Sequence, residues 1–84
     1  MESISKEIAP QRIRVNAIAP AIVRTPMGEA YLSFLPDDVA QKEQAAYPLD
    51  IGEPEDVAGM AAFLLSDAGK WITGRTIIMD GGRY

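Results

Sequence analysis

The chain has 84 residues, of which 48% are hydrophobic and 24% charged, and its net charge at pH 7 is −4. A chain of this size forms at most one small domain that buries roughly 60–65% of its unfolded surface, so an isolated core is marginal. The acidic balance argues against nucleic acid or an anionic membrane surface as a partner. Cysteine and histidine are both absent, which excludes disulfides, thiolate metal sites, imidazole acid–base chemistry and the common zinc sites.

The sequence carries no obvious targeting feature. No apolar run approaches the roughly 20 residues that cross a bilayer, and the first residues lack the pattern of a secretory signal peptide. From these observations we expect a soluble, cytoplasmic protein that binds neither membranes nor nucleic acid.

Residues 1–9 place Met1, Ile4 and Ile8 on one helical stripe. No capping residue precedes this stripe, although helices usually begin with one. We therefore expect the tail of a longer helix, with Met1 an internal methionine of a longer chain. Pro10 is expected to end the helix, because the residue before a proline is disfavoured in the helical region.

Residues 13–19 are apolar at alternate positions, with Arg14, Asn16 and Ile18 between them, which fits a strand buried mostly on both faces. We expect Pro20 to end this strand. The following stretch, 26–47, is the least regular of the sequence. Within it, Pro36 and the two aspartates behind it indicate the start of a short helix. The stretch is either a lid over the strand end or an ordinary connector, and the residues leave both open.

Residues 53–66 give the clearest helical pattern. Pro54 suits the first helical position, and the acidic residues around it complement the positive end of the helix dipole. Gly59 costs roughly 1 kcal/mol relative to alanine inside a helix, and close packing on a sheet is the expected reason for it. The predicted apolar face comprises Val57, Met60, Ala61, Leu64 and Ala68, widened by Phe63 and Leu65.

A turn at Gly74 leads into a short apolar strand, residues 76–79, which Asp80 and the two following glycines terminate. Two apolar strands separated by a long helix imply a parallel pair joined by a right-handed crossover. The predicted fold class is therefore α/β, in the order helix tail, strand, helices, strand. Two strands and two or three helices make up half of such a layer.

The sequence offers no set of catalytic residues. Neither glycine-rich phosphate-binding pattern occurs, the serines have no histidine to activate them, and no tyrosine is followed four residues later by lysine. We therefore assign no catalytic residue and no metal site. Ligands of open α/β sheets lie outside the carboxyl ends of the strands, where residues 20–25 offer backbone groups and the Thr25 hydroxyl. This inventory suits a flat carboxamide, but the residues alone favour a plain strand-to-helix turn.

Three segments together resemble one family. They are "IAPQRIRVNAIAPAIVRTPM", "PLDIGEPEDVAGMAAFLLSD" and "WITGRTIIMDGG", and they look like the C-terminal third of the short-chain dehydrogenase/reductase family. Within it they are most similar to the 3-oxoacyl-acyl-carrier-protein reductase type. The resemblance implies part of a Rossmann-type doubly wound parallel sheet, with residues 13–19 as its sixth strand, 26–47 as substrate-loop helices and 74–80 as its seventh strand.

The resemblance also implies a role for the loop after the first strand. In the family this loop touches the nicotinamide end of NAD or NADP. Carried over, Pro20 and Ala21 line the ring, Val23 binds the carboxamide through its backbone, and Thr25 adds its hydroxyl. The family usually has glycine at the position of Ala21, and an alanine there costs roughly 1 kcal/mol or more if the backbone needs a positive φ.

Two functions follow as hypotheses. In the first, residues 1–84 are one incomplete segment of an NAD(P)-binding domain. This segment would serve an oxidoreductase that transfers hydride between cofactor and a small carbonyl or alcohol, inactive without the missing N-terminal part of the fold. Because the family's glycine-rich turn and its catalytic Asn, Ser, Tyr and Lys are not in this chain, we expect no tight cofactor binding by the chain alone. In the alternative, the chain is a non-catalytic, homo-oligomerising module derived from that fold.

Overall fold

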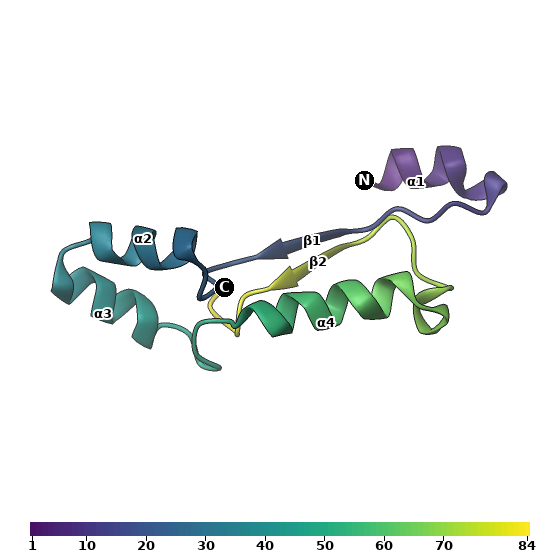
Figure 1. Ribbon diagram of the computed structural model, residues 1–84. Coiled ribbons are helices and arrows are strands. Elements are labelled where there is room, and N and C mark those ends of the chain that lie inside the picture. Colours follow the sequence, from purple (N-terminus) through teal and green to yellow (C-terminus); the bar gives the residue numbers. More distant parts are fainter.

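A computed structural model describes all residues 1–84. The molecule is elongated, 51 × 22 × 22 Å, with α2 and α3 at one end and α1 at the other (Figure 1). The elements, in chain order, are α1 (Glu2–Ile8), the 3₁₀ turn η1 (Ala9–Gln11), β1 (Ala17–Pro20), α2 (Pro26–Phe34), α3 (Asp37–Ala45), α4 (Pro54–Leu65), the 3₁₀ turn η2 (Asp67–Gly69) and β2 (Thr76–Met79).

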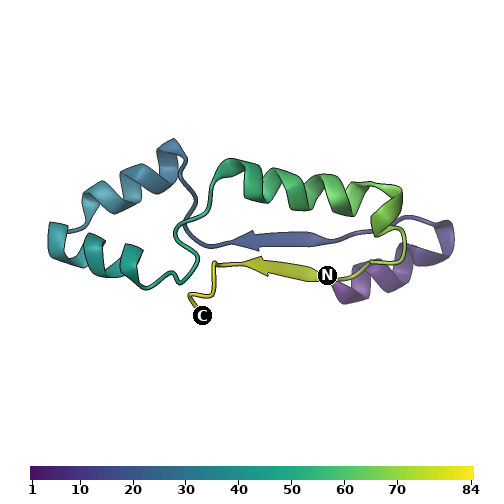
Figure 2. The same cartoon turned by 90° about the horizontal axis from the view of Figure 1, so that it is seen from below.

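The two strands form a parallel pair in which Ala17 lies opposite Thr76 and Pro20 opposite Met79. Helix α4 lies between them in the sequence and runs alongside them in space (Figure 2). The expected α/β arrangement of a parallel pair with a helical crossover is thereby confirmed.

The first strand is shorter and shifted relative to the expected range 13–19. Before Ala17 the chain is held by one backbone bond, from the Gly74 amide to the Val15 carbonyl at 2.8 Å, and by side chains. The Asn16 Nδ2 group donates to the Ile72 carbonyl at 3.0 Å, and the Arg75 amide donates to Asn16 Oδ1 at 3.1 Å. Pro20 is the last strand residue rather than the residue after it. The expectation of burial on both faces is wrong for this chain, because Ala19 and Pro20 are exposed.

Helix α1 ends at Ile8, and Pro10 lies in the 3₁₀ turn that follows, in agreement with the expected effect of proline. The helix docks through Ser5, which is buried and donates its hydroxyl to the Glu2 carbonyl at 2.7 Å. Gly74 lies against this serine with a φ of +75°, and a Cβ at that position would overlap Ser5 Oγ. The predicted turn at Gly74 is therefore also the segment against which α1 packs.

The irregular stretch after the loop folds into two helices. Helix α3 begins at Asp37, directly after Pro36, as the proline and acidic residues predicted. The residue pattern alone did not indicate helix α2, because its apolar side chains do not follow a single buried face, whereas the family resemblance implied helices over 26–47. Only Leu32 of α2 is buried.

Helix α4 begins at Pro54 as predicted, and the Glu53 amide donates to Asp56 Oδ2 at 2.8 Å, so an acidic side chain caps the first turn. The buried face is narrower than predicted. Leu64 is buried, whereas Phe63 and Leu65 are exposed, and Ala68 lies exposed in η2. The prediction of burial is wrong for Phe63 and Leu65, because the strands lie along only one side of the helix.

Gly59 contradicts a second expectation. A Cβ at this position would meet no atom within 4 Å, so the glycine faces open space rather than packing closely on the sheet. Nothing in the structure explains why a glycine occupies it.

The apolar core lies at the carboxyl ends of the strands. It consists of Leu32 from α2 together with Tyr47 and Ile51 from the link before α4, and Ala21, Ile22 and Leu35 pack against these three. The core therefore fixes the loop after β1 relative to α2. None of the helices combines the length and the apolar character needed to cross a membrane.

The opposite end of the molecule depends on one guanidinium. Arg14 Nη1 donates to the Leu64 carbonyl at 2.7 Å and to the Gly69 carbonyl at 3.0 Å. These carbonyls belong to the last turn of α4 and to η2, where helices leave carbonyl groups without partners. Arg14 thus caps the helix end from a segment 50 residues away in sequence.

Replacing Arg14 tests this cap. We expect Arg14→Ala to lower the free energy of unfolding by about 1.5–3 kcal/mol, the range for hydrogen bonds to charged groups. The control is Arg12→Ala, because Arg12 is exposed and makes no ion pair in the structure. Urea unfolding followed by circular dichroism measures both. An equal decrease in the free energy of unfolding for the two variants would contradict the proposed role of Arg14 as a cap.

Candidate functional site

The loop after β1 is held by backbone hydrogen bonds on two sides. The Ala21 amide donates to the Met79 carbonyl at 2.9 Å and so continues the ladder between the strands. Next, the Gly52 amide donates to the Ile22 carbonyl at 3.1 Å, and the Arg24 amide donates to the Gly52 carbonyl at 2.8 Å. The loop is therefore fixed both to β2 and to the segment that leads into α4.

A groove of about 760 Å³ opens beside this loop. It contains every residue that the sequence singled out as a cofactor contact and no charged residue. Its lining is Pro20, Ala21, Ile22, Val23, Thr25, Met27, Gly28, Tyr31, Pro54, Val57 and Ala58. The structure thus brings the four predicted positions together in one uncharged groove of a size suited to a small molecule.

Two walls of this groove escaped the sequence reasoning. Helix α2 contributes Met27 and Tyr31, and the start of α4 contributes Pro54 and Ala58. Exposed apolar residues at positions 27, 31 and 34 of α2 are spaced as one helical stripe. That stripe was the available signal, but the sequence showed the segment only as irregular, and as either a lid or a connector.

Val23, which lines the groove, has a backbone amide without a partner in the chain. Its amide donates to no group of the chain, whereas the amides of Ile22 and Arg24 are both engaged. The Val23 carbonyl accepts from the Thr25 amide at 2.7 Å and lies 3.3 Å from Thr25 Oγ1. A ligand acceptor in the groove can therefore take up the amide hydrogen without breaking a bond in the protein.

Thr25 has a structural role that the sequence reasoning missed. Its Oγ1 accepts from the Gly28 amide at 3.1 Å and so caps the start of α2, where Pro26 follows at the first helical position. The Thr-Pro pair was a signal for this helix start. Gly28 is required by the same turn, because a Cβ there would overlap the Val23 carbonyl oxygen.

Ala21 fits its position without backbone strain. Only Arg12 and Asp50 have a positive φ among the non-glycine residues. The cost expected for alanine in place of glycine therefore does not arise at Ala21 in this structure.

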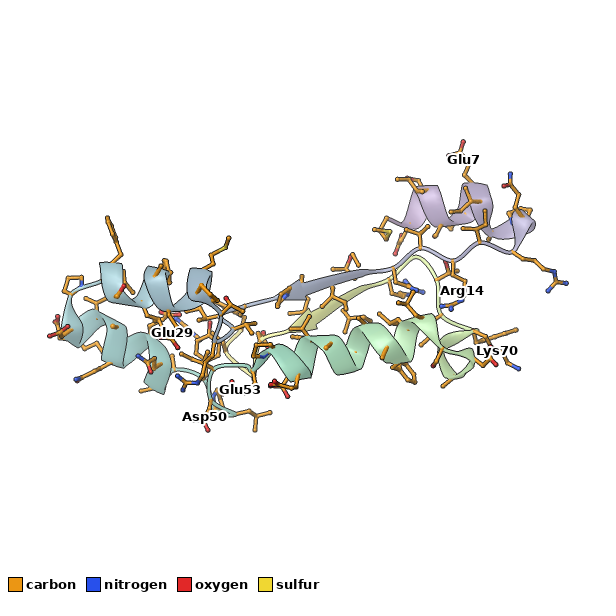
Figure 3. All side chains as sticks on the ribbon, in the orientation of Figure 1. Glu7, Arg14, Glu29, Asp50, Glu53 and Lys70 are labelled. Atoms are coloured by element: carbon orange, nitrogen blue, oxygen red, sulfur yellow. The ribbon has the colours of Figure 1, made fainter.

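One cation lies outside the groove beside its rim. Arg24 Nε lies 3.1 Å from Glu53 Oε1, and Arg24 Nη1 lies 3.8 Å from Glu29 Oε1. Figure 3 shows the two glutamates near the loop that joins β1 to α2. These side chains are well exposed, so each pair contributes little to stability. The two glutamates offset the positive charge of Arg24 next to the uncharged groove.

Comparison with known proteins identifies the family. A family model described as "Enoyl-(Acyl carrier protein) reductase" matches residues 1–83. A solved short-chain type dehydrogenase/reductase from Mycobacterium ulcerans superposes with a TM-score of 0.84 at 38% identity, over 99% of this chain and 30% of that one. The chain belongs to the short-chain dehydrogenase/reductase family.

Two further relatives extend the comparison. The 3-oxoacyl-[acyl-carrier-protein] reductase FabG of Aquifex aeolicus is 37% identical over 99% of this chain and 32% of its own length. The structure of a 4-hydroxyisoleucine dehydrogenase complexed with NADH has a TM-score of 0.84 at 32% identity, covering 98% of this chain and 33% of that one. The chain therefore spans about a third of the length of the short-chain dehydrogenases/reductases that it matches. The Rossmann-like α/β fold expected from the sequence is confirmed.

The cap at Thr25 can be tested separately from any ligand. We expect Thr25→Ala to lower the free energy of unfolding by about 0.5–2 kcal/mol, because the Gly28 amide loses its acceptor. Thr25→Ser keeps the hydroxyl and should lose much less. Chemical denaturation with far-ultraviolet circular dichroism compares the two. A serine variant as unstable as the alanine variant would show that the methyl group, not the cap, matters.

Proposed function

We propose that residues 20–25 form the nicotinamide side of an NAD(P) site in a short-chain oxidoreductase that interconverts a small carbonyl compound and its alcohol. The observation that carries this proposal is the free Val23 amide in the wall of an uncharged groove. A nicotinamide carboxamide has one carbonyl acceptor and one amide donor group on a flat ring. An uncharged, largely apolar groove suits the ring, and the exposed amide suits the carboxamide oxygen.

Each predicted residue takes a definite part in this proposal. Pro20 and Ala21 provide flat apolar surface against the ring. The Val23 amide donates to the carboxamide oxygen, and the Thr25 hydroxyl, which lies in the same wall, contributes a polar contact at the same edge. NAD or NADP, when bound, supplies or accepts the hydride. The chain's own residues bind and orient the ring and exclude water from one of its faces.

The rest of the groove favours an apolar substrate. Met27 and Tyr31 continue the groove along α2, and the Tyr31 hydroxyl belongs to the only polar side chain there besides Thr25. A charged substrate would lose its hydration in such a site with no ionised partner in the lining. We therefore favour an uncharged carbonyl or alcohol with apolar substituents.

Catalysis at the proposed site requires residues beyond the groove. The lining contains no acid–base pair, and proton transfer to a carbonyl oxygen needs a positioned acid. The remaining part of the short-chain dehydrogenase/reductase fold would supply it, together with the grip on the cofactor phosphates. Residues 1–84 alone would accordingly bind NAD(P) weakly and be inactive.

Unpaired strand edges favour a second candidate, a homo-oligomerising module. The sheet has only two strands, so each strand has an edge without a partner, and such edges pair readily with other chains. Ile78 in β2 is 69% exposed, and Trp71 before the strand is 94% exposed. A second copy covering these groups would bury surface that the chain leaves open.

Blocking the groove tests the cofactor site. Ala58 is exposed on α4 and lines the groove, whereas Ala62, one turn further along the same helix, is exposed and does not. In the intact protein we expect Ala58→Trp to weaken NADH or NADPH binding at least about tenfold, or about 1.4 kcal/mol, because the larger side chain would fill space in the groove. Ala62→Trp should bind normally. Cofactor fluorescence measures both, and unchanged affinity for Ala58→Trp would refute the proposed site.

Light scattering tests the oligomerising module. If residues 1–84 fold by themselves, we expect an oligomer at micromolar concentration, because the open strand edges and exposed apolar side chains drive association. Ile78→Lys should shift the population towards monomer, since a charge on an edge strand disfavours pairing. A monodisperse monomer with cooperative unfolding would exclude this candidate.

A further inference from the structure

The helices that form one side of the groove are attached to the rest of the molecule at few places, chiefly through Leu32 of α2, which packs in the core. We call α2 and α3, residues 26–45, the α2–α3 lobe. The lobe projects from the end of the sheet (Figure 2), and it is joined to the sheet through the loop 20–25 and the link 46–52. Because α2 carries Met27 and Tyr31 into the groove, whatever fixes the lobe also sets the width of the groove.

The C-terminal residues after β2, which we call the tail (80–84), turn back towards this lobe. Three hydrogen bonds to Asp80 define the turn. Its carbonyl accepts from the Arg83 amide at 2.9 Å, its Oδ1 accepts from the Gly82 amide at 3.0 Å, and its Oδ2 accepts from the Tyr84 amide at 3.3 Å. Figure 1 shows the C-terminus at the base of the lobe. The aspartate thus directs the tail away from the strand direction.

The tail is packed tightly on the link before α4. The Leu49 amide donates to the Gly81 carbonyl at 3.0 Å. Gly81 has a φ of +57°, and a Cβ there would lie 2.8 Å from the Asp50 carbonyl oxygen. Gly82 has a φ of +86° and lies against the ring of Pro48. Both glycines therefore permit a close approach that other residues would prevent.

Beyond this contact, one side chain of the tail reaches the lobe itself. Arg83 Nε and Nη2 each donate to a carboxylate oxygen of Glu43 in α3, both at 3.4 Å. The two side chains are 29% and 22% exposed, less than those of any other ion pair in the structure. The hydrogen bond to Glu43 raises the pKa of the Arg83 guanidinium. The contact is bidentate, which fixes the relative orientation of the two side chains as well as their distance.

We propose that Arg83 is a positioning residue: its pair with Glu43 clamps the tail onto α3 and thereby holds the α2 wall of the groove in place. The clamp joins residues 40 positions apart and spans the link on which Tyr47 and Ile51 contribute to the core. Its consequence for NAD(P) binding rests on the proposed function, whereas the clamp itself does not.

Hydrogen–deuterium exchange in the intact protein tests the clamp. For Arg83→Ala we expect amides of α2 and α3 to exchange about fivefold faster, while those of α4 keep their rates, because losing a partly screened ion pair eases local opening. The charge-swapped protein, Arg83→Glu with Glu43→Arg, should recover protection. The matched control is Arg75→Ala, which breaks the pair with Glu2 at 3.2 Å far from the lobe. Unchanged exchange in the lobe, or an equal rise in α4, would overturn the clamp.

A second measurement separates the clamp from the cofactor site. The dissociation constants of NADH and NADPH are measured for the same variants. We expect Arg83→Ala to weaken binding by about the factor by which lobe exchange rises, and the charge swap to restore it. Faster lobe exchange with unchanged affinity would overturn the effect on the groove. If even the unmodified protein binds neither nucleotide, the proposed function fails, and the exchange data alone decide whether the clamp exists.

Discussion

The fold and the site both depend on the backbone bridge between the loop after β1 and Gly52. Two hydrogen bonds, from the Gly52 amide to the Ile22 carbonyl and from the Arg24 amide to the Gly52 carbonyl, tie the exit of the first strand to the entry of α4. This bridge leaves the intervening amide of Val23 without a partner and pointing out of the bonded set. The same constraint that holds the chain together therefore creates the free donor of the groove.

Polar contacts, more than apolar packing, fix the positions of the elements in this chain. Only four hydrophobic side chains are buried, and three of them form the cluster at the strand ends. Away from that cluster, position is set by side chains that satisfy backbone groups, namely Arg14 at the end of α4, Thr25 at the start of α2 and Asp56 at the start of α4. With so small a core, each such cap is a large fraction of a marginal stability.

The sequence was most informative where a local chemical signal determines the structure. Proline followed by acidic residues predicted the starts of α3 and α4, and three segments predicted the family and its parallel strands. It was least informative where a side chain serves a distant partner. The residue pattern did not indicate α2, because its exposed stripe lines an open groove, although the family resemblance implied helices there. The outer apolar residues of α4 were assigned to a face that nothing in the chain covers. Hydrophobic periodicity reports a core only when the covering surface is present.

The candidate site shows the same division. Its loop was predicted because it follows a strand, but the walls from α2 and α4 lie 23 to 31 positions apart in sequence and meet only through the fold. The groove is therefore formed in two ways: by a short loop that backbone hydrogen bonds fix to β2 and Gly52, and by helix α2, which Leu32 packs against the core.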